Sequence, residues 1–292
     1  MEITKITPQG FCKGVIYAIK QINIVLKNNK YKKPLYMLGG IVHNQHIIDA
    51  FKEKGIEIIN TIENINEGTI IITAHGVSNT LKQKILSKGL DIIDTTCIEV
   101  RKIQDIINKK EKESYSIIYF GTSSHPECKS IIEDHKDLKL IEKIEDIDKL
   151  DISNNKLFFA SQTTLSNSDV KKAFEILQNK YPYITKASDI CNSTFLRQNA
   201  LNKEIDNFDM ILVVGDKNSN NTTKLLSIAK AKKEAYLIEN IDDLKTIDFS
   251  KVKRLGITAG ASAPNLLVDE IIKTIKDKDY ISKVVNQDYI NI

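Results

Sequence analysis

The chain has 292 residues, of which 41% are hydrophobic and 27% are charged, and its formal net charge at pH 7 is +4. This composition is typical of a globular protein. Lysines alternate with acidic residues, as in KEKGIEIINTIEN, so there is no basic stripe of the kind that binds nucleic acid. The N-terminus MEITKITPQGFC has no apolar signal core, and no run of about 18 apolar residues follows it. We therefore expect a cytoplasmic protein without nucleic-acid or membrane partners.

Apolar strands, polar loops and amphipathic helices alternate along the chain. Strands are predicted at 34–38, 69–73, 91–94, 116–120, 156–160, 210–214, 235–239 and 254–258. Helices are predicted at 14–28, 44–54, 78–88, 98–112, 166–180, 192–206, 220–232 and 265–277, and the stretch YFGTSSHPECKSI begins as a strand and ends as a helix. Several strands are continuous β-branched runs, which is typical of sheets covered by helices on both faces. The pattern predicts an α/β fold with mainly parallel sheets.

Three cysteines, Cys12, Cys97 and Cys191, are separated by similar lengths of chain, and each stands directly before a predicted helix. This spacing predicts three βα modules that each offer one thiol to a shared centre. The alternative is three unrelated buried cysteines, since cysteine is common in protein cores. In a reducing compartment, cysteines indicate metal binding or catalysis more than disulfides.

The loops after the predicted strands carry an unusual number of polar side chains. Because ligands of open α/β sheets bind beyond the carboxyl ends of the strands, these loops are candidate site residues. A single histidine there would be an ordinary structural residue, but three with a carboxylate indicate a site. The loops contribute His43, His75, His125, Glu127, Thr163, Ser219, Asn221 and Ser262.

The hydroxyl and amide loops have two interpretations. Ser, Thr and Asn are ordinary N-caps of helices, but helix N-termini also bind anions such as a diphosphate. The chain contains neither G-x-x-x-x-G-K-[ST] nor G-x-G-x-x-G, so ATP or a dinucleotide held in the usual way is not expected.

Three cysteine ligands indicate a particular cofactor. Structural zinc normally takes four ligands, often in C-x-x-C pairs, and the chain has no such pair. A [4Fe–4S] cluster held by three thiolates keeps one iron without a protein ligand, which could bind a substrate oxygen while the cluster supplies electrons. The fourth cysteine, Cys128, is expected to be a small buried residue and not a ligand.

The motifs GFCKGV, VHN, AHGVS, DTTC, SSHPE, SQTTLS, DIC, KNSNN and AGASAP occur in this order between residues 10 and 268. In this the chain resembles the 4-hydroxy-3-methylbut-2-enyl diphosphate reductases, the LytB or IspH family. The resemblance implies three small α/β modules in a pseudo-threefold trefoil around a central iron–sulfur cluster. We expect these modules to span 13–97, 98–189 and 190–292, with residues 1–12 packing against the third.

The resemblance also implies the activity, which is reductive dehydroxylation of 4-hydroxy-3-methylbut-2-enyl diphosphate to isopentenyl and dimethylallyl diphosphates. This is the last step of the methylerythritol phosphate route to isoprenoids, and it needs an electron donor, ferredoxin or flavodoxin. A bacterial cytoplasmic protein is favoured over a processed plastid-type one. The residues carried over are Cys12, Cys97 and Cys191 as ligands of a [4Fe–4S] cluster, Glu127 as proton donor, and His43, His75, His125, Thr163, Ser219, Asn220, Asn221 and Ser262 as substrate-binding residues.

The chain departs from the family pattern at four positions. Ile98 replaces a proline after the second cysteine, Lys13 replaces a small residue after the first, Asn220 stands where a serine is common, and Cys128 is atypical. None of these departures removes a cluster ligand or the acid.

Alternatives to this interpretation remain open at the level of sequence. His43, His75 and His125 could bind zinc in a hydrolase. A non-catalytic iron–sulfur regulator or RNA-binding protein would leave the strand-end pocket unexplained, and an NAD-dependent reductase would lack its fingerprint. Glu127 could be an ordinary first-turn residue stabilised by the helix dipole, whereas burial would favour its protonated form and suit it as an acid.

Overall fold

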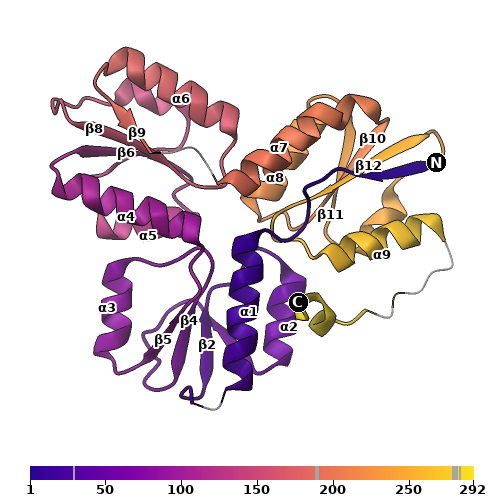
Figure 1. Ribbon diagram of the computed structural model, residues 1–292, viewed down its shortest axis with the longest axis horizontal. Coiled ribbons are helices and arrows are strands. Elements are labelled where there is room, and N and C mark those ends of the chain that lie inside the picture. Colours follow the sequence, from indigo (N-terminus) through magenta and orange to yellow (C-terminus); the bar gives the residue numbers. More distant parts are fainter. Residues whose placement is uncertain (29, 188–190, 278–281, 283) are drawn as a thin grey trace.

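The computed structural model describes the whole chain except residues 29, 188–190, 278–281 and 283. The described residues form three four-stranded sheets in which all strand pairs are parallel. Figure 1 shows the sheets and their helices as three lobes around a common centre. The predicted α/β fold of three modules is therefore confirmed.

The first sheet has the strand order β3-β2-β4-β5. Its strands are β2 (Leu35–Leu38), β3 (Ile56–Ile59), β4 (Thr69–Ile72) and β5 (Asp91–Asp94). Its helices are α1 (Lys13–Lys27), α2 (Gln45–Glu53) and α3 (Asn79–Ser87). Every residue of the central strand β4 is buried, as a continuous apolar run requires. Helix α3 begins after Ser78, whose hydroxyl accepts a hydrogen bond of 2.9 Å from the Leu81 N–H, an N-cap that fixes where the helix starts.

The second sheet has the order β7-β6-β8-β9. Its strands are β6 (Ser116–Phe120), β7 (Lys139–Ile141), β8 (Leu157–Ser161) and β9 (Thr185–Lys186). Its helices are α4 (Ile98–Lys112), α5 (Pro126–Asp134) and α6 (Asn167–Lys180), with a 3₁₀ turn at Ile144–Lys149. Helix α5 opens with Pro126, whose fixed φ suits the first helical position, where no N–H is needed.

The third sheet has the order β1-β12-β10-β11, so the N-terminal strand pairs with a strand from the other end of the chain. Its strands are β1 (Glu2–Lys5), β10 (Met210–Val214), β11 (Glu234–Ile238) and β12 (Arg254–Ala259). Its helices are α7 (Asn192–Glu204), α8 (Asn220–Lys230) and α9 (Asn265–Lys276). The short 3₁₀ helices in this part of the chain are η2 (Ile205–Asn207), η3 (Ile241–Thr246) and η4 (Asn286–Ile290).

The apolar core joins the first and third sheets. One cluster of buried side chains includes Ile19 of α1, Met37 of β2 and Phe51 of α2 together with Leu212 of β10 and Leu267 of α9. The second sheet has separate clusters on its two faces. Helix η4 near the C-terminus packs against α2, as Figure 1 shows, and so adds to the contact between the first and third sheets. Packed apolar side chains therefore hold the first and third sheets together in the described part of the chain.

All eight predicted strands and all eight predicted helices are present within one or two residues of their expected bounds, and the helix expected after the strand at Tyr119 is α5. The sequence missed four strands: β1, β3, β7 and β9. Each of them lies at the edge of its sheet. Edge strands are short and are covered less completely, so they do not need the continuous apolar run that revealed the central strands.

The predicted module boundaries stay predictions, and the one between residues 189 and 190 lies outside the described residues. Within the described part of the chain, no helix is both long enough and apolar enough to cross a membrane.

Candidate active site

Nine loops meet at one cavity in the centre of the molecule, and each sheet contributes three of them. The loops that follow β1, β5 and β9 each carry one cysteine, and those after β2, β4, β6, β8, β10 and β12 carry the other polar side chains. The space between the protein atoms that line the cavity is about 680 Å³, a figure that includes space open to solvent.

Every residue of the predicted site lines this cavity. They are Cys12, His43, His75, Cys97, His125, Glu127, Thr163, Cys191, Ser219, Asn220, Asn221 and Ser262. Their convergence follows from the parallel sheets, since the carboxyl ends of parallel strands lie at one edge. The structure thus brings the predicted residues together, and the role of each stays a prediction.

The three cysteines are the N-cap residues of α1, α4 and α7, and none of their side chains caps its own helix. All three are half-buried. Burial, with the nearby thiols of Cys12 and Cys191 acting in the same direction, raises the pKa of Cys97 to about 11, whereas backbone N–H groups of α4 lower it. Burial likewise raises the pKa of Cys191, against N–H groups of α7. Three neighbouring thiols at helix N-termini form a donor set that suits a metal centre, which would stabilise the thiolates.

A glycine makes room for the thiols. A Cβ added at Gly14 would lie 2.6 Å from Cys97 Sγ and 3.8 Å from Cys12 Sγ, so only hydrogen fits there. By contrast, Cys128 is fully buried in the apolar cluster around Tyr119 and Ile131, and it does not line the cavity among the residues described.

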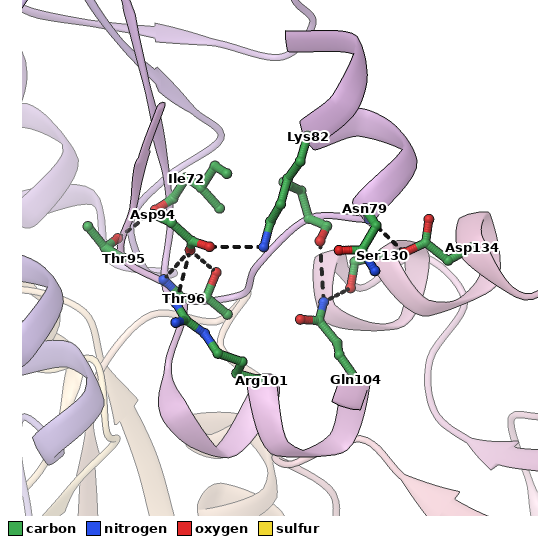
Figure 2. A network of polar contacts seen from close by, with 11 residues as sticks. Ile72, Asn79, Lys82, Asp94, Thr95, Thr96, Arg101, Gln104, Ser130 and Asp134 are labelled. Carbon is green, nitrogen blue, oxygen red and sulfur yellow. Dashed lines mark hydrogen bonds and ion pairs between the residues drawn. The ribbon is translucent and has the colours of Figure 1, made fainter. Parts of the chain in front are cut away.

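The loop before Cys97 is held by a network centred on Asp94 (Figure 2). The Asp94 carboxylate accepts hydrogen bonds from the N–H and the hydroxyl of Thr96, and Lys82 Nζ lies 2.9 Å from it. Thr95 Oγ1 donates to the Ile72 carbonyl at 2.6 Å. These bonds hold the turn that precedes Cys97, because the Asp94 carboxylate and the Thr95 and Thr96 hydroxyls all bond to groups of the first module.

Three imidazoles stand together on one wall of the cavity. The ring centroid of His43 lies 4.8 Å from that of His75 and 5.6 Å from that of His125, and the latter two are 5.3 Å apart. Burial lowers the pKa of each ring, of His125 to about 4. All three are therefore neutral at pH 7 and can donate an N–H to an anion or a hydroxyl. The buried Nε2 of His43 has no partner within the described chain, so a ligand atom can satisfy it.

Glu127 lies in the first turn of α5 and is 1% exposed. Its Oε1 accepts a hydrogen bond from the Thr163 N–H at 2.9 Å, and its Oε2 accepts one from Thr163 Oγ1 at 2.8 Å. The Glu127 N–H donates to His125 Nδ1 at 3.2 Å, which fixes the tautomer of that ring. Burial raises the pKa of the carboxyl to about 7 although the hydrogen bonds from Thr163 oppose the shift. A carboxyl with this pKa can give up a proton at neutral pH.

The N-terminus of α8 also lines the cavity and adjoins the imidazoles, because Ser262 Oγ donates to the His43 carbonyl at 3.2 Å. Ser219 caps this helix by accepting from the Thr222 N–H at 3.4 Å, and Ser262 Oγ lies 3.3 Å from Ser219 Oγ. Asn221 is 2% exposed, and neither polar atom of its amide has a partner in the described structure. The Asn221 Nδ2 is thus an unsatisfied buried donor at a helix N-terminus, which is a feature of an anion site.

Thr164, which follows Thr163 in one of the polar loops after the strands, also lines the cavity. Sequence reasoning missed two residues near the cavity. Tyr119 places its hydroxyl 3.4 Å from Glu127 Oε1, and the buried Arg197 bonds the Gly10 and Ser193 carbonyls beside two of the cysteines. A signal for Arg197 was present: with Thr194, Gln198 and Leu201 it forms the i, i+3, i+4, i+7 stripe that α7 buries.

A cavity that combines three converging thiols with a buried acid, neutral imidazoles and an anion site, all at the strand ends of an α/β fold, is typical of an oxidoreductase with a thiolate-bound metal centre.

The chain belongs to the LytB family, whose model, described as LytB protein, matches residues 3–276. It is 38% identical over 288 residues to the 4-hydroxy-3-methylbut-2-enyl diphosphate reductase of Bacillus thuringiensis (strain Al Hakam), and the match covers 96% of this chain and 91% of the relative. The enzyme of the same name from Anoxybacillus flavithermus (strain DSM 21510 / WK1) is 37% identical over 289 residues, with the same coverage.

Solved structures agree with this family. The E-1-hydroxy-2-methyl-but-2-enyl-4-diphosphate reductase from Plasmodium falciparum superposes with a TM-score of 0.90 at 29% identity, covering 99% of this chain and 96% of that one. A structure described as (E)-4-hydroxy-3-methyl-but-2-enyl diphosphate reductase, the terminal enzyme of the non-mevalonate pathway, gives a TM-score of 0.69 at 29% identity, covering 94% and 99%. The resemblance found in the sequence motifs is thereby confirmed.

Proposed function

We propose that this protein reduces 4-hydroxy-3-methylbut-2-enyl diphosphate to isopentenyl and dimethylallyl diphosphates, the last step of the methylerythritol phosphate route. The overall reaction removes the hydroxyl as water and consumes two electrons and two protons. The observation that carries the proposal is the cavity itself, which is lined by three thiols and by a buried carboxyl whose pKa is about 7. The family membership and the names of the relatives support it.

The thiols of Cys12, Cys97 and Cys191 fit an iron–sulfur cluster of the [4Fe–4S] type. Three ligands are available, the helix N-termini offer N–H groups to the sulfurs, and Gly14 keeps space free between two of them. When bound, such a cluster supplies electrons and an iron without a protein ligand as a Lewis acid for the substrate oxygen.

Glu127 is the proton donor in this proposal. Hydroxide is a poor leaving group, so the oxygen must be protonated as the C–O bond breaks. With a pKa of about 7, a large fraction of Glu127 is protonated at neutral pH. The Thr163 hydroxyl, 2.8 Å from the carboxyl, can orient the acid or pass the proton on.

The remaining residues hold the substrate. Ser219, Asn221 and Ser262 lie at the N-terminus of α8 and bind the diphosphate through neutral donors, with Asn220 beside them. The imidazoles of His43, His75 and His125 provide further N–H groups between this anion site and the acid. Neutral donors suit this task because charge-assisted hydrogen bonds to a phosphate oxygen are strong even without a formal cation.

The electrons come from a small acidic protein, ferredoxin or flavodoxin. The residue after each cysteine is exposed, namely Lys13, Ile98 and Asn192, and Ile98 exposes 58% of its surface. A partner that docks over these helix N-termini would approach the thiols from the solvent side, and Lys13 would complement its negative charge. All four cysteines are free, and thiols persist in the reducing cytoplasm of a bacterium, where we place the reaction.

One arrangement favours a second candidate. The ring nitrogens of His43, His75 and His125 lie within 4.8 Å of one another and could hold a metal ion such as the zinc of a hydrolase. The two candidates differ in the metal that they require.

The deciding experiment is metal analysis and turnover of protein purified without oxygen. We expect about four irons and four sulfides per chain, a brown colour, and formation of both products from the hydroxylated diphosphate with an artificial reductant. Protein that binds one zinc through the imidazoles and incorporates no iron would refute the reductase proposal.

A further inference from the structure

The cavity is short of positive charge. A cluster with three thiolates is anionic and gains a further negative charge on reduction, and the proposed substrate brings a diphosphate into the same space. Among the described residues that line the cavity there is no lysine and no arginine. Helix N-termini contribute only partial charges, so a full positive charge has to come from a residue that does not itself line the cavity.

Arg197 is buried in that position. It lies on α7, the helix that Cys191 caps, and is 4% exposed. Its Nη2 donates to the Gly10 carbonyl at 2.6 Å and its Nη1 to the Ser193 carbonyl at 2.8 Å. Gly10 precedes Cys12 by two residues and Ser193 follows Cys191 by two, so one guanidinium holds both cysteine-bearing segments.

Among the described residues, no ion pair joins Arg197 to a carboxylate. Burial lowers the pKa of Arg197, and the ionisable thiols of Cys12 and Cys191 oppose this effect. Its Nε is buried and has no hydrogen-bond partner within the described chain. A guanidinium stays protonated in proteins, and a buried charge without a counter-charge is strongly destabilising. Two nearby thiolates would satisfy it.

We propose that Arg197 is the counter-charge of the cluster: it offsets the negative charge at Cys12 and Cys191 and thereby makes the cluster easier to reduce. Arg197 is a positioning residue, because it acts through the cysteines and does not itself line the cavity. The inference rests on the proposed function, since it requires a thiolate-bound cluster.

The alternative is that Arg197 only holds the backbone through its hydrogen bonds to the Gly10 and Ser193 carbonyls. Two substitutions separate the effect of its positive charge from the effect of these hydrogen bonds. Neither Arg197→Lys nor Arg197→Gln can bond both carbonyls with a planar fork, but lysine keeps the charge and glutamine does not. A third variant, Gln198→Ala, is the matched control. Gln198 is the next residue of α7 and is equally buried, but it contacts Leu165 and Asn167 of the second module.

The experiment measures iron and sulfide content, the thermal midpoint and the one-electron reduction potential of the cluster in each anaerobically purified variant. For Arg197→Gln we expect the equilibrium constant for one-electron reduction of the cluster to fall at least tenfold. This corresponds to a reduction potential lower by about 59 mV. The potential of Arg197→Lys should stay close to that of the wild-type protein, and Gln198→Ala should lower only the thermal midpoint. If Arg197→Gln folds but holds no cluster, retention of iron by Arg197→Lys supports the same conclusion.

The inference is overturned if the lysine and glutamine variants behave alike, either with an unchanged potential or with equal loss of iron, because the charge then plays no part. Wild-type protein that assembles no iron–sulfur cluster would instead contradict the proposed function, so the two failures can be told apart.

Discussion

Replacing Glu127 by glutamine should separate the chemistry from the binding. Glutamine has the same shape, its carbonyl can still accept from the Thr163 N–H, and its amide can donate to Thr163 Oγ1. The substrate pocket and the thiols should therefore be unchanged, but the residue can no longer give up a proton. We expect kcat to fall by about 10²–10⁴-fold, the usual contribution of a general acid.

The same substitution should stabilise the protein in a pH-dependent way. Burial raises the pKa of Glu127 from 4.5 to about 7, so the folded chain binds this proton more tightly than the unfolded chain. The stability that this group contributes is complete below pH 4.5 and is lost as the pH rises through 7, and the difference corresponds to about 3 kcal/mol. Cluster-free Glu127→Gln should thus be more stable than the wild type at pH 8 and should lose that advantage near pH 5.

The measurements are steady-state turnover of the loaded enzyme and thermal midpoints of the cluster-free protein at pH 5 and pH 8. Wild-type kcat should decline as the pH rises above about 7, where the acid ionises. The control is Glu133→Gln, which removes a carboxylate from the exposed end of the same helix, where it accepts from Ser78 Oγ. Near-normal turnover of Glu127→Gln with an intact cluster would refute the role of Glu127 as the acid. A stability difference between Glu127→Gln and the wild type that does not change with pH would refute the rise in the pKa of Glu127 through burial.

Further substitutions test the other roles. Serine at a ligand cysteine should abolish most iron binding because an alkoxide is rarely available at neutral pH, whereas Cys128→Ser, in the apolar core, should keep its iron; equal iron loss in all four variants would contradict the assignment of Cys12, Cys97 and Cys191. Alanine at the predicted diphosphate anchors should raise KM more than it lowers kcat, and failure of cluster assembly would argue against placing the anion at Ser219, Asn221 and Ser262. Lys13→Glu should raise KM for ferredoxin or flavodoxin and leave turnover with an artificial reductant unchanged; a loss with both reductants would indicate damage to the site.

Local patterns in the sequence were enough for most of the fold. Runs such as TIII and MILVV are buried along their whole length, and such runs occur where helices cover both faces of a parallel sheet. The polar site residues were found because they follow these strands directly, whereas the three cysteines were found because each stands directly before a predicted helix. The missed strands β1, β3, β7 and β9 are edge strands, whose pairing depends on a neighbour distant in sequence, as β1 pairs with β12.

The sequence by itself determined which residues stand at the strand ends and at the starts of helices, because hydrophobic periodicity and capping are local properties of the chain. Only the tertiary structure decided that the three cysteines meet, that Glu127 is buried enough for its pKa to rise to about 7, and that Arg197 reaches the Gly10 carbonyl across 187 residues of sequence. Such features depend on how the modules pack, as in the core shared by the first and third sheets. Burial and the distance between charges are set by residues far apart in the chain, and no local pattern encodes them.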